Sequence, residues 1–305
     1  MAAHARRPVQ PQDRHARAQD VHGRGRADRR CRHVPGVPED RAAAAGALPG
    51  RARHREGARL DRAEESGQPA QVRKGRAGGA LVIAHRGASA RELENSLAAF
   101  RAAGPLGADA VELDIHATAD GALVVHHDET VAGRHIPHLT GRQVRELRLQ
   151  NGEPVPTLPE ALEAAGAALG VFVEVKSLTP PFDERLFDAL AHGPNPSGYA
   201  VHSFDHRIIR RLGLERPALP RGVLSSSYLI RPLAALEDAG ATTLWQERTV
   251  VDGALVEVLH AAGMRLLVWT VDDPAEMRRL LELGVDGLCT NHPEVGRQAV
   301  DVRAA

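Results

Sequence analysis

The sequence has few aromatic residues and little cysteine. Its 305 residues include five Phe, two Trp and two Tyr, and all of these lie after residue 80. The first quarter therefore lacks the large side chains that supply most of a core's buried area. The two cysteines, Cys31 and Cys289, are too few for a disulfide framework, so the sequence does not require an oxidising compartment.

Long apolar runs are absent as well. No stretch of about 18 consecutive apolar residues occurs, so no transmembrane segment is expected. The start of the chain is basic, but no apolar stretch follows it, and no secretory signal is visible. We therefore expect a cytoplasmic location. The composition gives no prediction of the oligomeric state.

The net charge is zero, but it is unevenly distributed along the chain. Residues 1–80 contain 18 Lys and Arg against 9 Asp and Glu, and the remainder contains 21 against 30. Residues 1–79 are mainly Ala, Arg, Gly and Pro without periodicity, which predicts a disordered extension. One interpretation is a basic arm that binds nucleic acid or anionic lipid. We favour a solvated tail, or an extension created by a wrongly assigned start codon.

From residue 80 onward, short apolar runs alternate with helical stretches, the pattern of an α/β protein with a parallel sheet. Strands are predicted over residues 81–84, 110–115, 123–126, 171–175, 199–202, 222–224, 242–245, 265–269 and 287–289. Helices are predicted over residues 95–103, 158–168, 205–212, 254–262 and 274–283. The third strand follows the second after too short a link for a parallel crossover, so it forms an antiparallel arm. The others predict a (β/α)₈ TIM barrel within residues 80–305.

Carboxylates lie on one face of two predicted barrel strands. Glu112 and Asp114 alternate with apolar residues and therefore share a face. Like charges on one face need a positive partner, and a divalent cation supplies one; a polar edge or a nearby arginine are the alternatives. Glu174 and Lys176 repeat the pattern on the next parallel strand, where a simple ion pair between the two is the alternative for Lys176. Three carboxylates suit Ca²⁺ or Mg²⁺ better than zinc, because this set has no thiolate or imidazole.

Two histidines follow predicted strands. His85-Arg86-Gly87 comes directly after the first strand, and His127-Asp128 closes the antiparallel arm. The carboxyl ends of barrel strands are where active sites form. Two histidines there can act as a general acid and a general base, and an arginine can bind a phosphate through two hydrogen bonds. The chain has 16 histidines, so the hypothesis depends on position and not on histidine alone.

Together these residues resemble the glycerophosphodiester phosphodiesterase family over about residues 81–295. The resemblance is carried by His85-Arg86-Gly87, Glu94-Asn95-Ser96 with Phe100, Glu112-Leu113-Asp114, Val124-Val125-His126-His127-Asp128 and Glu174-Val175-Lys176. Supporting blocks are Pro156-Thr157-Leu158-Pro159-Glu160, Ser203-Phe204, Trp269-Thr270-Val271, and Gly284-Val285-Asp286-Gly287 followed by Thr290-Asn291-His292-Pro293. Each block is weak alone, but their order and spacing are specific.

The resemblance implies a barrel enzyme that hydrolyses glycerophosphodiesters to glycerol 3-phosphate and an alcohol, with a substrate hydroxyl as nucleophile and a cyclic phosphate that water opens. By position, it implies three ligands for a divalent metal, Ca or Mg: Glu112, Asp114 and Glu174. It implies His85 and His127 as the acid and the base. It also implies Arg86 and Lys176 as phosphate contacts, and Trp269 as a substrate contact against the glycerol moiety.

The chain departs from the family pattern at three places. Leu93 stands where proline is usual, and Asn291 stands where aspartate is common. We interpret Asn291 as a loop contact. Residues 130–150 are shorter than the insertion that many members carry here, so the alcohol head group is not predicted.

Two other functions remain open at this point. One is phospholipase D-like action on lysophospholipids or sphingomyelin, since such barrels share the histidine and carboxylate plan. The other is a non-catalytic protein whose basic arm binds nucleic acid. The catalytic positions are all present, so we expect a small-molecule substrate and no nucleic-acid partner.

Overall fold

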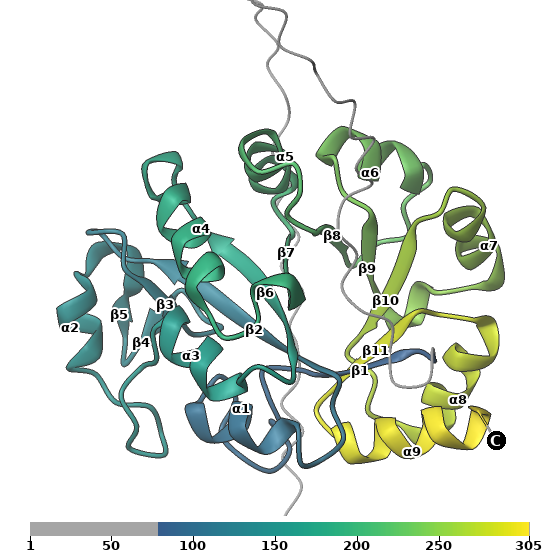
Figure 1. Cartoon of the computed structure of the whole chain (residues 1–305), viewed down its shortest axis with the longest axis horizontal. Helices are drawn as coiled ribbons and strands as arrows, with labels where there is room; N and C mark the ends of the chain where they lie inside the picture. Colours follow the sequence, from purple (N-terminus) through teal and green to yellow (C-terminus); the bar gives the residue numbers. More distant parts are fainter. Residues whose placement is uncertain (1–78, 305) are drawn as a thin grey trace, which may run out of the picture. The chain divides into compact units, whose positions relative to one another are not determined.

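The computed structural model describes residues 79–304. The predicted disordered extension, apart from residue 79, lies outside the described residues. Eight parallel strands form a closed sheet, because the strand order β1-β11-β10-β9-β8-β7-β6-β2 is completed by pairing of β1 with β2. Their bounds are β1 (Leu81–Ala84), β2 (Ala110–Ala117), β6 (Gly170–Ser177), β7 (Tyr199–Ser203), β8 (Arg221–Ser225), β9 (Thr243–Glu247), β10 (Arg265–Trp269) and β11 (Gly287–Thr290). The predicted (β/α)₈ barrel is confirmed (Figure 1).

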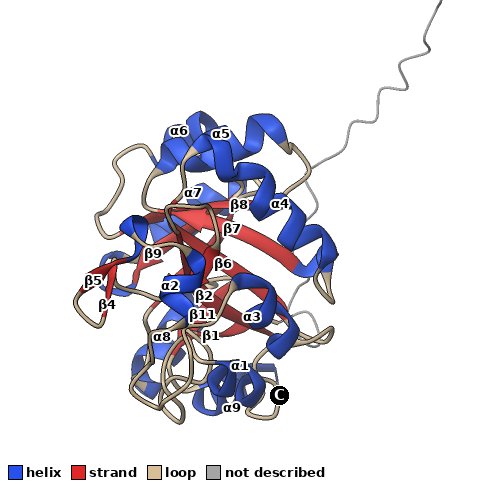
Figure 2. Cartoon of the chain, turned by 90° about the vertical axis from the view of Figure 1, so that its left-hand side faces the viewer, coloured by secondary structure: helices blue, strands red, loops and turns tan. Residues whose placement is uncertain are grey.

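The antiparallel arm is also confirmed. Strand β3 (Leu123–Val125) pairs antiparallel with the end of β2, after a turn in which Gly121 has φ +79°. A second hairpin, β4 (Thr130–Val131) with β5 (Arg134–His135), was not predicted. Each of its strands has two residues, too few to show a period in the sequence. Figure 2 shows this hairpin at the side of the barrel.

Helices lie outside the strands, as Figures 1 and 2 show. Their bounds are α1 (Leu97–Ala103), α2 (Gly141–Arg145), α3 (Leu158–Ala165), α4 (Asp183–His192), α5 (His206–Glu215), α6 (Pro232–Ala239), α7 (Gly253–Ala261), α8 (Pro274–Leu283) and α9 (Pro293–Ala304). Helix α8 has the predicted bounds, because the Asp273 side chain accepts from the N–H groups of Ala275 and Glu276. The prediction omitted α2, α4, α6 and α9. None of the helices within residues 79–304 is long and apolar enough to cross a membrane.

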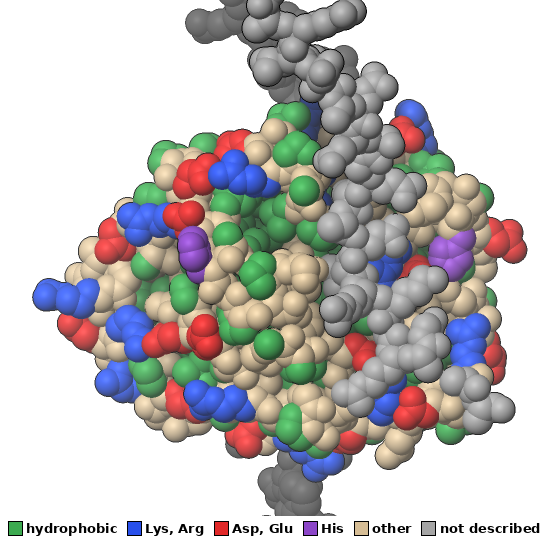
Figure 3. Space-filling model, in the orientation of Figure 1, with side chains coloured by type: hydrophobic (Ala, Val, Ile, Leu, Met, Phe, Trp, Pro, Cys, Tyr) green, Lys and Arg blue, Asp and Glu red, His purple; other side chains and the backbone are tan. Residues whose placement is uncertain are grey.

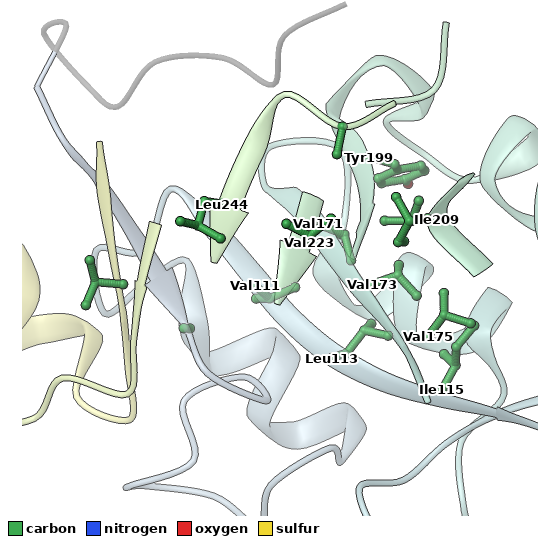
Figure 4. Packing of buried hydrophobic residues seen from close by; sticks show 14 of the residues in the cluster. Val111, Leu113, Ile115, Val171, Val173, Val175, Tyr199, Ile209, Val223 and Leu244 are labelled. Atoms are coloured by element: carbon green, nitrogen blue, oxygen red, sulfur yellow. The ribbon is translucent and has the colours of Figure 1, made fainter. Parts of the chain in front are cut away.

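The strand alternation expected for β2 is present. Val111, Leu113 and Ile115 are fully buried in the layer between the barrel and its helices, beside Val173 and Val175 of β6 (Figure 4). A second buried cluster fills the barrel interior with residues that include Phe172, Trp245, Leu267 and Cys289. Because apolar residues of β2 face outward, the alternate residues Glu112 and Asp114 face into the barrel.

Close packing inside the barrel makes Gly222 of β8 a sensitive position. A Cβ atom added there would lie 2.8 Å from Cδ1 of Trp245 and 3.1 Å from the carbonyl oxygen of Thr243. We expect Gly222→Ala to lower the free energy of unfolding by about 1–3 kcal/mol, the usual cost of overpacking. Chemical denaturation measures this. Gly104→Ala is the control, because its Cβ would meet Leu169 only at 3.7 Å; equal losses in both variants would contradict the packing argument.

Candidate active site

Four titratable side chains meet inside the barrel. Glu112 and Asp114 come from β2, Glu174 from β6 and His202 from β7. The strand register places Asp114 opposite Glu174, and Glu174 opposite His202. All four are buried, with no more than 7% of any residue exposed. A buried cluster with three carboxylates requires positive charge nearby.

Two positively charged side chains, those of Lys176 and Arg86, contact this cluster. Nζ of Lys176 lies 3.0 Å from Oδ1 of Asp114 and 2.7 Å from Oε1 of Glu174. Nε of Arg86 lies 3.2 Å from Oδ2 of Asp114, and its backbone N–H donates to Oε2 of Glu112 at 3.1 Å. The guanidinium also binds Glu94, with Nη1 2.8 Å from Oε1. The structure thus brings together the predicted carboxylates and both predicted phosphate-binding residues.

Asn95 holds this arrangement and was not predicted as a site residue. Its Nδ2 donates to Oδ2 of Asp114 at 2.8 Å, and its Oδ1 accepts from the backbone N–H of Asp114 at 3.3 Å. Asn95 and Arg86 both have positive φ, 55° and 56°, which is uncommon outside glycine. The backbone N–H of Asn95 donates to the carbonyl of Arg86. Strained backbone of this kind gathers at functional sites, where surrounding contacts hold it.

The backbone conformation and close packing of Gly87 explain why glycine follows His85 and Arg86. Its φ is +82°, and an added Cβ would lie 2.7 Å from the backbone of Ala99 in α1. Only glycine fits there without moving α1 or the loop. The loop after β1 is therefore pressed against the first helix, which fixes the positions of His85 and Arg86.

Three side chains could hold a metal ion. One ligand atom each from Glu112, Glu174 and His202 lie within 4.8 Å of one another. Burial, followed by repulsion from Asp114 and Glu174, raises the pKa of Glu112 well above its usual value. Burial and the charge of Asp114 raise the pKa of Glu174 to about 7. These two carboxyl groups resist ionisation unless a metal cation binds between them. The donor set therefore fits a divalent metal.

Asp114 differs from the other two predicted ligands. Its oxygens contact Lys176, Arg86 and Asn95. Burial opposes ionisation of Asp114, but Lys176 and Arg86 outweigh it, so its pKa lies below the usual value. The prediction that Asp114 binds metal stays a prediction, while His202 lies at the place where a third ligand would be.

His85, at the end of β1, is oriented by Asn291. The Nδ1 atom of the half-buried imidazole lies 2.8 Å from Oδ1 of Asn291. Nδ2 of Asn291 donates to Oδ2 of Asp272 at 2.7 Å, so the amide oxygen faces His85. Nδ1 of His85 is then the donor, and Nε2 carries the lone pair. Burial, followed by the charge of Arg86, lowers the pKa of His85.

The interpretation of Asn291 as a loop contact was therefore too narrow. Its side chain touches a predicted catalytic residue 206 positions away along the chain. This contact depends on the pairing of β11 with β1, which joins the last barrel strand in the sequence to the first. Neighbouring residues in the sequence carry no sign of it.

His127 lies beyond β3, half-buried, with Nδ1 2.8 Å from Oδ1 of Asp128. The buried ring of His116 contacts the His127 carbonyl through Nε2 at 3.1 Å and so fixes that backbone. A cavity of about 700 Å³ is lined by residues of this loop and of the loop after β1, including Glu94, Asn95, His126 and His127. Strand β3 ends at Val125, before His126. His126 lines the same cavity as His127. Because neither residue is in the strand, strand alternation does not place their side chains on opposite faces.

Trp269 ends β10 and packs edge-on against Phe204, with ring centroids 5.6 Å apart. Phe204 is 47% exposed and, with Glu174 and Lys176, lines a second hollow of about 490 Å³. The Nε1 atom of Trp269 is buried without a hydrogen-bond partner among the described residues. The aromatic rings of Trp269 and Phe204 therefore lie next to the charged cluster. Trp269 is the residue for which the sequence predicts a substrate contact.

An eight-stranded parallel barrel that brings buried carboxylates, two cations and histidines to one place is an enzyme scaffold with a site suited to a phosphate ester. Comparison with known proteins gives the family. The Glycerophosphoryl diester phosphodiesterase family model matches residues 85–295. The chain belongs to this family and is an enzyme of its class.

Individual relatives agree with this assignment. A glycerophosphodiester phosphodiesterase of Caldanaerobacter subterraneus subsp. tengcongensis is 35% identical over 230 residues, which cover 70% of this chain and 95% of that protein. A glycerophosphodiester phosphodiesterase structure from Parabacteroides distasonis has a TM-score of 0.67 and 29% identity, covering 74% of this chain and 98% of the other. An Oleispira antarctica phosphodiesterase, solved with its product sn-glycerol-3-phosphate, has a TM-score of 0.66 and 25% identity, covering 72% and 96%.

Proposed function

We propose that this chain hydrolyses glycerophosphodiesters to glycerol 3-phosphate and an alcohol with the help of a divalent metal. One observation carries the proposal: Arg86 and Lys176 converge on Asp114, beside the buried carboxylates Glu112 and Glu174. A phosphodiester bound by these two basic side chains would lie beside the carboxylates, and a divalent metal held by the carboxylates would supply positive charge to both. The product bound in the Oleispira antarctica relative supports the same substrate class.

The proposed role of His85 is that of general base. Because Nδ1 faces Asn291, Nε2 is available to take the proton from a hydroxyl next to the phosphate of the substrate. That oxygen attacks phosphorus, and the step is intramolecular because the hydroxyl and the phosphate belong to the same substrate molecule. The bond from phosphorus to the alcohol oxygen breaks, and His127 protonates the leaving alcohol. Water then opens the cyclic phosphate, and the protons return by the reverse transfers.

The basic side chains stabilise the charge that develops on the phosphoryl oxygens. Arg86 and Lys176 are held in place by carboxylates before substrate binds, so little reorganisation is needed. Glu112, Asp114 and Glu174 are the predicted metal ligands, and a metal bound there would supply Lewis-acid stabilisation of the same oxygens. Trp269, with Phe204, would pack against the glycerol moiety.

A substrate panel tests this proposal. Glycerol 3-phosphate release from glycerophosphocholine, glycerophosphoethanolamine and glycerophosphoinositol is measured with added Mg²⁺, Ca²⁺ or Mn²⁺. Lysophosphatidylcholine is included with choline release as its readout, because its other product keeps the acyl chain, and because the 47% exposed Phe204 beside the site is compatible with such a chain. Hydrolysis of lysophosphatidylcholine without glycerophosphodiester hydrolysis would favour the phospholipase D-like alternative. No release from any of them would reject the proposal.

The binding-protein alternative depends on residues 1–79, most of which lie outside the described residues. On the uncovered part of the face drawn in Figure 3, acidic and basic side chains of the described residues are interspersed. A salt-dependent shift of duplex DNA that disappears without residues 1–79 would support the alternative. A cytoplasmic location stays a prediction.

The pH dependence of kcat/KM tests the role of His85. A general base works in its neutral form, so activity falls as the pH drops below its pKa. Burial and Arg86 lower that pKa, and a bound cation would act in the same direction. We expect the acid limb of the kcat/KM profile below about pH 6.5, the ordinary histidine value.

Asn291→Ala is the matched variant for this profile. It removes a contact that favours protonated His85, so the acid limb should move to lower pH. Looser orientation of the ring should also reduce kcat, by part of the roughly 10²–10⁴-fold that a general base contributes. An acid limb that moves upward in Asn291→Ala would contradict the assignment of His85 as base.

A further inference from the structure

The imidazole of His202 is held rigidly inside the barrel. It is 1% exposed and stacks on the indole of Trp245, with ring centroids 4.2 Å apart and planes 10° apart. Trp245 reaches this position over Gly222, where any side chain would collide with the indole. The register places His202 directly beside Glu174 on the neighbouring strand. The ring therefore faces the carboxylates in a fixed plane.

Neither ring nitrogen of His202 has a hydrogen-bond partner within the described part of the chain. Nδ1 is buried and unpartnered. Nε2 has Oε1 of Glu112 at 3.8 Å, which is too far for a hydrogen bond. An unsatisfied buried polar group is costly and calls for an explanation, such as an ion or a water. A histidine held in this position beside two buried carboxylates thus indicates that a further group, such as an ion, binds here.

We propose that His202 is a nitrogen ligand of the divalent metal, together with Glu112 and Glu174. The inference deepens the proposed function by specifying its metal centre. The three ligand atoms lie within 4.8 Å of one another. Ligands at about 2.0–2.3 Å from one ion are separated by no more than about 4.6 Å, so small side-chain movements bring all three onto a single ion.

The nitrogen donor changes the expected metal. Oxygen-only sets suit Ca²⁺ and Mg²⁺, whereas imidazole suits borderline transition metals. The three carboxylates alone disfavour zinc because they include no imidazole, and His202 supplies one. The site should therefore prefer ions such as Mn²⁺, Co²⁺ or Zn²⁺ over Ca²⁺. A protonated Glu112 bonded to His202, or a bridging water, would instead leave the metal with oxygen ligands alone.

Pulsed electron paramagnetic resonance of the Mn²⁺-loaded full chain tests the ligand directly, because a coordinated imidazole couples its ¹⁴N nucleus to the electron spin. We expect this coupling in the wild type and its loss in His202→Gln, with Mn²⁺ still bound through the carboxylates. His206→Gln is the control, since His206 contacts the carbonyl of Leu224 and lies outside the group of potential metal ligands. No coupling in the wild type would overturn the proposal, as would coupling that persists in His202→Gln.

A competition titration measures selectivity. The ratio of the Ca²⁺ dissociation constant to the Co²⁺ dissociation constant should fall at least tenfold in His202→Gln, since losing even an outer contact to a metal ligand costs roughly 10–100-fold. It should stay unchanged in His206→Gln. If His202→Gln does not fold, His202→Asn takes its place. An unchanged ratio would overturn the proposal. Nitrogen coupling without any glycerophosphodiester hydrolysis would reject the proposed function and leave the metal site intact.

Discussion

Removal of divalent cations is expected to abolish hydrolysis by this chain, and Glu112→Gln or Glu174→Gln is expected to do the same with metal present. Both carboxylates are buried beside Lys176 and Arg86. Without a metal, the transferring phosphoryl group loses several kcal/mol of charge stabilisation, equivalent to roughly 10³-fold or more in kcat. Release of glycerol 3-phosphate is measured after treatment with EDTA and again after Mn²⁺, Mg²⁺ or Ca²⁺ is added.

The same variants should not unfold the protein. Ionised Glu174 is unfavourable in the metal-free barrel, because burial and Asp114 raise its pKa to about 7. In the unfolded chain its pKa is near 4.3. A carboxyl whose folded pKa is raised destabilises the fold as pH rises between these two values. At pH 7.5 metal-free Glu174→Gln should therefore be at least as stable as the wild type.

Glu163→Gln is the activity control, since Glu163 is exposed on α3, away from the barrel interior. Full wild-type activity after exhaustive chelation would show that no metal takes part. Activity lost together with the folded circular-dichroism signal would show that Glu112 and Glu174 are structural.

The barrel and much of the site could be predicted from the sequence because they depend on local patterns. Alternation with period two is visible within β2, and it places Glu112 and Asp114 on the inner face. The same rule puts Glu174 and Lys176 on the inner face of β6. The end of the first predicted strand likewise places His85 at the carboxyl end of the barrel. Each of these inferences needs only a few neighbouring residues.

Contacts between distant strands could not be predicted in this way. His202 lies on the inner face of β7, which alternation allows, but its role depends on Glu112 of β2 and Trp245 of β9. Asn291 reaches His85 only because the sheet closes. Asn95 acts through a backbone with positive φ, which no pattern of apolar residues indicates.

Some helices were omitted because their starts lie in irregular segments. Helix α4 follows a one-turn 3₁₀ helix at Pro180–Phe182, and Arg231 before α6 provides no side-chain cap. No side chain caps the start of either helix, so the N-cap signal is missing at both places. These helices cover the barrel but contribute none of the predicted site residues, so the omission did not affect the site.

His85→Ala and His127→Ala are each expected to lower kcat by roughly 10²–10⁴, the usual contribution of general acid–base catalysis. His85 is oriented by Asn291, and His127 is held through its carbonyl by His116 and through Nδ1 by Asp128. Neither ring is in the buried core, so thermal unfolding should change little. Steady-state kinetics at saturating metal measures the loss.

His126→Ala is the matched comparison for His127→Ala. Both rings line the same cavity, so exposure to substrate alone does not separate them. His126 differs because its backbone N–H donates to the carbonyl of Asp114, and its Nδ1 contacts the backbone carbonyl of Asp128. These contacts tie His126 to the loop backbone, whereas Nδ1 of His127 contacts the carboxylate of Asp128, as expected of a ring with the proposed role in proton transfer. We therefore expect a smaller loss of kcat in His126→Ala. An essential His126 with a dispensable His127 would mean that the proton donor is the residue that directly follows β3.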